Sequence, residues 1–206
     1  MHDQLLNFLF SPSLDRVGQA VLFAFAVIAC VVYYRPLVER RRLHIYVRLA
    51  IFAALFRLLF AAAKTGLQYY AWTQTELTKL LLPPHQSISV LLRYAWTHFW
   101  LNAFISIGGA LLFFIVLRAL QAHNPRYFEG GEVELGALMA LVAGWPYFVV
   151  FVPAVFLSIV LVSIIRGIFL HEPYTALGLP FFIGYAIALV STGYIIAALS
   201  LTSIII

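Results

Sequence analysis

Long runs of apolar residues, separated by short polar segments, make up most of this chain. They lie approximately at residues 17–34, 45–63, 98–117, 135–165 and 179–206. A run of about 20 apolar residues is long enough to cross a bilayer as a helix. No polar segment between the runs leaves room for a separate soluble domain. The pattern therefore predicts an all-α, polytopic protein of the cell membrane, with residues 1–206 forming a single integral-membrane domain.

The fourth apolar run is too long for one upright helix. Residues 135–165 would extend about 46 Å as a straight helix, whereas the hydrocarbon core of a bilayer is about 30 Å thick. A Gly-Trp-Pro sequence at residues 144–146 offers a turn. We therefore predict a short helix that ends at Ala143 and a second helix over residues 147–165, with a kinked single span as the alternative. Five to six transmembrane helices result, and the side of the C-terminus stays open.

Composition agrees with this class of protein. The chain is 64% hydrophobic and 10% charged, with a mean hydropathy of +0.97, far from the values of soluble domains. A net charge of +5 would suggest nucleic-acid binding in a soluble protein, but no recognition fold can be placed here. Membrane lipids are the expected partners instead. Five arginines follow the first run against the single acid Glu39, which predicts a cytoplasmic loop and an external N-terminus: Arg35, Arg40, Arg41, Arg42 and Arg48.

Two arginines lie in or beside the second apolar run. Arg48 and Arg57 are nine residues apart, so they point from opposite faces of a helix. The aliphatic stem of an arginine can bend toward the headgroups. We therefore expect both side chains to snorkel, and a buried functional charge is the alternative.

Small and polar residues recur at four-residue spacing in two of the predicted helices. One such face holds Asn102, Ser106 and Ala110, and the other holds Gly184, Ala188 and Thr192. Faces of this kind normally pack against a neighbouring membrane helix, because small residues let two backbones approach closely. Helix packing is therefore the prediction, although a transport pathway is an alternative reading of the same polar residues.

Catalytic and metal-binding signatures are scarce. The single cysteine, Cys30, excludes a disulfide or a four-cysteine zinc site within the chain. No serine nucleophile elbow or phosphate-binding glycine loop is present. Four potential ligands lie within twelve residues, but their spacing matches no metal signature: His123, Glu129, Glu132 and Glu134. We interpret them as a solvated loop in which Arg126 pairs with Glu129, and we expect neither a metal nor a cofactor.

Two stretches in the second half of the chain share a recognisable layout. Residues 130–145 read Gly-Gly-Glu-Val-Glu-Leu-Gly-Ala-Leu-Met-Ala-Leu-Val-Ala-Gly-Trp, and residues 179–189 read Leu-Pro-Phe-Phe-Ile-Gly-Tyr-Ala-Ile-Ala-Leu. Their order and spacing, over about residues 110–199, resemble the type IV prepilin peptidases. That family has a Gly-x-Gly-Asp-x-Lys-Leu run that opens a short helix, then small residues, a long apolar helix and a final helix opening with Pro-Phe.

The resemblance implies a membrane aspartyl protease that cleaves basic leader peptides of pilin-like proteins at the cytoplasmic membrane face. Such chemistry requires two acids, one ionised and one protonated. The only aspartates, Asp3 and Asp15, precede the first apolar run. Glu132 occupies the position of the motif aspartate, so a catalytic role maps onto this residue alone. The resemblance further implies a binding role for its neighbours Glu129, Gly130, Gly131 and Glu134, of which Glu129 replaces the first motif glycine and Glu134 the lysine.

Three functions remain open at the level of sequence. The first is a non-catalytic relative that binds pilin-like leader peptides, or an assembly partner of a type IV pilus system, through its small-residue faces and its acidic loop. The second is an active leader peptidase that uses Glu132 with a second acid, Glu39 or Glu134. The third is a small transporter or membrane scaffold. The missing aspartates favour the first function.

Overall fold

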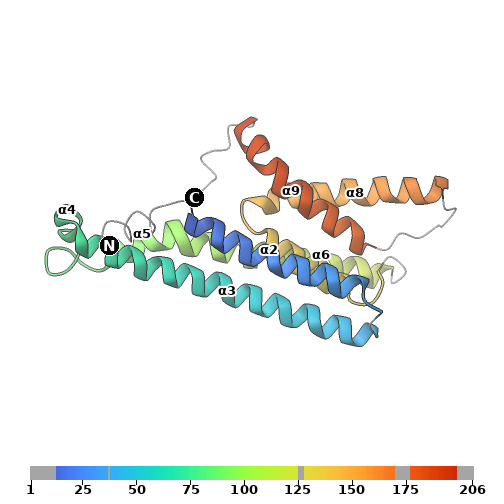
Figure 1. Cartoon of the computed structure of the whole chain (residues 1–206), viewed down its shortest axis with the longest axis horizontal. Helices are drawn as coiled ribbons and strands as arrows, with labels where there is room; N and C mark the ends of the chain where they lie inside the picture. Colours follow the sequence, from blue (N-terminus) through green and yellow to red (C-terminus); the bar gives the residue numbers. More distant parts are fainter. Residues whose placement is uncertain (1–12, 37, 125–127, 170–176, 199–206) are drawn as a thin grey trace.

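The computed structural model describes residues 13–36, 38–124, 128–169 and 177–198, and within these ranges the chain is helical without strands. The all-α prediction is therefore confirmed. The helices, labelled as in Figure 1, are α2 (Ser13–Tyr34), α3 (Glu39–Gln74), α4 (Glu76–Lys79), α5 (Ser89–Ala95), the π-helical turn η1 (Trp96–Trp100), α6 (Leu101–His123), α7 (Glu132–Ala143), α8 (Tyr147–Phe169) and α9 (Gly178–Ala198).

Four helical stretches within the described residues are long and apolar enough to cross a membrane, which indicates a membrane protein. They are Leu14–Tyr34, Glu39–Gln74, Ser89–His123 and Tyr147–Ile168. α9 is apolar over the shorter range Gly178–Ser191, and α7 has only 12 residues. The prediction of five to six spans is therefore not confirmed.

The second and third spanning helices extend well beyond the predicted apolar runs. The run at residues 45–63 lies inside a helix of 36 residues, and the run at residues 98–117 lies inside one of 35 residues. Hydropathy falls where polar residues begin, but the backbone hydrogen bonds of a helix continue until a residue breaks them. The apolar runs therefore mark the middles of these helices rather than their ends.

The predicted hairpin is present. α7 ends at Ala143, α8 begins at Tyr147, and Gly144 adopts a positive φ of +59° between them. α8 leads back toward the end of the molecule at which α7 begins, and α9 begins at that end as well (Figure 1). α7 therefore penetrates the helix bundle only partway, and the kinked single span is ruled out.

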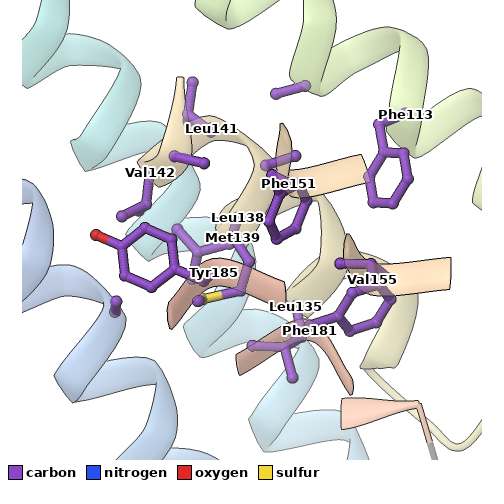
Figure 2. Packing of buried hydrophobic residues seen from close by; sticks show 14 of the residues in the cluster. Phe113, Leu135, Leu138, Met139, Leu141, Val142, Phe151, Val155, Phe181 and Tyr185 are labelled. Carbon is purple, nitrogen blue, oxygen red and sulfur yellow. The ribbon is translucent and has the colours of Figure 1, made fainter. Parts of the chain in front are cut away.

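α7 forms the centre of the core and packs against α2, α3, α6, α8 and α9. Of its twelve residues only Ala137 is not buried. A helix that is apolar on all sides is stable only where other elements surround it. Figure 2 shows its side chains meeting those of α6, α8 and α9, among them Phe113, Leu135, Leu138, Met139, Phe151, Val155 and Phe181.

Candidate functional site

The Gly130-Gly131 turn leads the chain into α7, and the two glycines differ in their surroundings. Gly131 has a φ of +89°, in the left-handed region that residues with a side chain rarely adopt. At Gly130 a Cβ atom would overlap Oε1 of Glu39, so the start of α3 packs directly on this backbone. The turn places Glu132 at the first position of α7.

Glu132 uses both carboxylate oxygens to bind backbone amides. The N–H of Glu129 donates to Oε2 at 2.9 Å, and the N–H of Gly178, the first residue of α9, donates to Oε1 at 2.7 Å. The Glu132 residue is only 3% exposed. The first amides of a helix lack partners within the helix and favour a negative charge. Glu132 therefore joins the beginning of α7 to the beginning of α9.

Two opposing effects act on the acidity of Glu132. Burial raises the pKa of its carboxyl group above the ordinary value of 4.5, and the nearby charge of Glu129 acts in the same direction. The amides of Glu129, Gly178 and Leu177 stabilise the ionised form and act against this shift. Burial is the larger effect, so the site shifts the carboxyl toward its protonated form.

Phenol groups face Glu132 from α2 and α3. Tyr33 and Tyr46 lie within electrostatic range of its carboxyl group. The Tyr33 ring packs against the start of α9, where a Cβ atom on Gly178 would overlap the ring, and the Tyr46 ring lies against Gly131. A phenol is a far weaker acid than a carboxylic acid. Neither tyrosine therefore replaces the second acid of a two-carboxyl mechanism.

The acids proposed as partners of Glu132 lie in different places. Glu134 is buried and points toward α6, where Arg118 donates from Nη2 to Oε1 at 2.6 Å. Glu39 is exposed and covers the backbone of Gly130. Glu129 is exposed, and its charge acts on Glu132. The fold therefore gathers Glu39 and Glu129 around the turn and directs Glu134 away from it.

The prediction that Arg57 snorkels to the headgroups is wrong. Its Nε donates to the carbonyl of Leu141 at 3.0 Å, and its Nη2 donates to the carbonyl of Val142 at 3.2 Å. A Cβ atom on Gly144 would overlap the guanidinium group. The physical reason is that α7 ends inside the protein, where its last carbonyls lack helical partners. The planar guanidinium offers several donors to such groups, whereas Arg48 on the opposite face is exposed as expected.

The two small-residue faces pack inside the protein. Ser106 accepts a hydrogen bond from the N–H of Trp145 at 2.8 Å, which fixes the turn between α7 and α8 on α6. Gly184 lets α9 approach α8 so closely that a Cβ atom would lie 2.5 Å from Val155. Ala110 and Ala188 are buried, and the side chain of Thr192 lies outside the described residues. Packing is confirmed, but these faces are occupied and are not available to a partner protein.

The loop before α7 does not assemble a metal site from the residues that the structure describes. Among them, no group of three His, Cys, Asp or Glu side chains could hold a metal ion. His123 ends α6 and Glu132 is buried at the start of α7. The predicted pairing of Arg126 with Glu129 involves a residue outside the described ranges.

Comparison of the chain with protein-family models, with curated proteins and with solved structures finds no match in any of the three. The relation to prepilin peptidases therefore stays a prediction from the motif and its spacing.

Proposed function

We propose that this chain is a non-proteolytic membrane protein with the architecture of a prepilin peptidase, which binds leader segments of pilin-like proteins at the cytoplasmic membrane face. The observation that carries this proposal is the bonding of Glu132. Both of its oxygens accept hydrogen bonds from backbone amides, so the acid at the motif position has a structural use. Accepting these hydrogen bonds does not require Glu132 to take part in a catalytic reaction.

The surroundings of Glu132 also favour binding over hydrolysis. Cleavage by a pair of acids requires one carboxylate to activate water while the other donates a proton. α2 and α3 place the phenols of Tyr33 and Tyr46 near Glu132, and the Glu39 side chain lies against Gly130. Glu134, one of the candidate second acids, is committed to Arg118.

Leader binding is proposed because two acidic side chains lie beside the Gly130-Gly131 turn. Glu39 and Glu129 are both exposed beside the Gly130-Gly131 turn, at the end of the molecule that the arginine pattern assigns to the cytoplasm. Each of these carboxylates can pair with a basic side chain of a leader, and this pairing does not depend on bond cleavage.

Photocrosslinking tests the binding. A photoreactive phenylalanine replaces Phe128, which leaves both acids in place, and a second variant carries it at Leu77 in α4, at the other end of the molecule. Co-expressed prepilin should crosslink at position 128, remain uncleaved and fail to crosslink at position 77. Glu39→Gln with Glu129→Gln should weaken the adduct, whereas Glu76→Gln, an exposed acid on α4, should not. Adducts with lipid alone at position 128 would refute leader binding.

An active leader peptidase is the second candidate, favoured by the contact of Glu39 with Gly130. In that case membranes that contain the chain should cleave a co-expressed prepilin. Both Glu132→Gln and Glu39→Gln should abolish the cleavage, whereas Glu76→Gln should leave it intact. Cleavage with this pattern would refute the non-proteolytic proposal.

A further inference from the structure

Four arginines gather where α2 ends and α3 begins. Arg35 follows the last residue of α2, and the other three lie in the first turn of α3. We name this group the basic corner: Arg35, Arg40, Arg41 and Arg42. Three of them are exposed, and Arg42 is partly buried.

The positive charge of the basic corner is not balanced by the acids of the described residues. The ion pairs found among those residues are Lys64–Asp15 and Arg118–Glu134, and neither involves the corner. Its single sequence neighbour of opposite charge, Glu39, is packed on Gly130. Several guanidinium groups without carboxylate partners repel one another unless an external anion lies between them.

In Arg42 and the nearby Tyr46, two polar groups are buried without partners in the described structure. The Nε of Arg42 is one of them, although its Nη2 donates to the carbonyl of Arg35 at 3.3 Å. The second is the hydroxyl of Tyr46, a residue that is only 1% exposed and that lies within electrostatic range of Arg42. Buried polar groups normally have a hydrogen-bond partner. The basic corner thus combines unpaired surface charge with unused buried hydrogen-bonding capacity.

The position of the basic corner identifies the kind of anion. It connects the ends of two membrane-length helices, which is the depth of lipid headgroups. Tyr34 precedes Arg35, Val38 lies between Arg35 and Arg40, and the two residues are 66% and 71% exposed. Tyrosine is enriched at this depth because its ring is apolar and its hydroxyl is polar. A ligand here meets basic and apolar surface side by side, as a phospholipid does and as a free anion does not.

We propose that the basic corner binds the phosphate headgroup of an anionic phospholipid. The guanidinium groups of Arg40 and Arg41 provide the exposed charge, and the planar fork of a guanidinium matches the oxygens of a phosphate. Arg42 provides the inner donor. Basic residues beside a membrane helix favour anionic lipid by about fivefold in affinity for each residue. This proposal does not rest on leader binding.

Native mass spectrometry of the purified full chain tests it. The protein in detergent is mixed with phosphatidylglycerol or phosphatidylcholine, and retained adducts are measured. The wild type should retain phosphatidylglycerol preferentially, and Arg40→Gln with Arg41→Gln should lower that affinity about 25-fold. The control is Lys79→Gln with Arg93→Gln, which removes the same charge from exposed positions in α4 and α5. The control pair should bind as the wild type does.

A second pair, Arg40→Lys with Arg41→Lys, guards against damage to the fold. It keeps the charge, so most of the lipid affinity should remain. Retention of phosphatidylglycerol by the glutamine pair at the wild-type level would overturn the proposal, and so would an equal loss in the control pair. Displacement of the lipid by an equimolar amount of inorganic phosphate would identify a free-anion site and would also overturn it.

Discussion

Replacing Arg57 by lysine separates two roles that an arginine within a membrane helix can have. A snorkelling arginine needs only a long stem and a positive charge, and lysine has both. In this structure Arg57 instead binds two consecutive carbonyls, those of Leu141 and Val142, with two nitrogens of one planar group. Lysine has a single ammonium and cannot reproduce that geometry.

The expected magnitude follows from these two bonds. A hydrogen bond to a charged group contributes about 1.5–3 kcal/mol. Arg57→Lys loses at least one of the two and keeps the buried charge, so it should lower the free energy of unfolding by about 2 kcal/mol. Arg57→Met loses both bonds, but it also removes a cation whose burial at mid-membrane costs about 2.5–3.5 kcal/mol. The methionine variant should therefore be destabilised to an extent similar to the lysine variant.

Equilibrium unfolding of the purified protein in mixed micelles measures the stabilities of these variants. Arg48→Lys is the matched control, because Arg48 lies in the same helix and its side chain is exposed. The control should unfold as the wild type does. Wild-type stability of the Arg57→Lys variant would refute the proposed capping of α7 and would restore the snorkelling interpretation.

Other predictions concern the two ends of α7. Gly144→Ala places a side chain at a φ of +59° and should destabilise the fold by about 1–3 kcal/mol, measured by the same unfolding assay. Gly178→Ala should push α9 away from Tyr33 and speed amide exchange at the start of α9, whereas Gly108→Ala, where a Cβ atom meets nothing within 4 Å, should change neither property. Burial raises the pKa of Glu132, so its contribution to stability is greatest below the ordinary pKa of 4.5 and is lost as the pH rises through the higher folded value. Between pH 4.5 and the folded pKa of Glu132, the free energy of unfolding should therefore fall less steeply with pH in the Glu132→Gln variant. An unchanged slope would contradict a raised pKa for Glu132.

The hairpin could be predicted from the sequence because two independent constraints agree. Residues 135–165 are too long for one upright helix, and residues 144–146 supply a break at the point where a short helix has to end. The burial of α7 on all sides follows the same logic, since a run without a polar face has no side that favours water. Local pattern and chain length are sufficient for both conclusions.

The direction of Arg57 and the partners of Glu132 could not be predicted in this way. Helical periodicity shows that Arg48 and Arg57 lie on opposite faces, but it does not show which face meets the protein. Gly178, which donates to Glu132, is 46 residues away in the chain. A signal was nevertheless present for Arg57: a helix that ends within a membrane leaves carbonyls that require a donor.

A short helix that stops inside an apolar bundle has unpaired backbone carbonyls at its end, and this protein satisfies them with a charged side chain. Glu132 binds amides near the beginnings of α7 and α9, and Arg57 binds carbonyls at the end of α7. The positions match the helix dipole, with an acidic side chain at the amino end and a cation at the carboxyl end. A carboxyl group at the motif position therefore has a structural use whether or not a peptide bond is cut. For this reason the acid at the motif position does not by itself establish proteolysis. Proteolysis requires a second acid that acts together with Glu132.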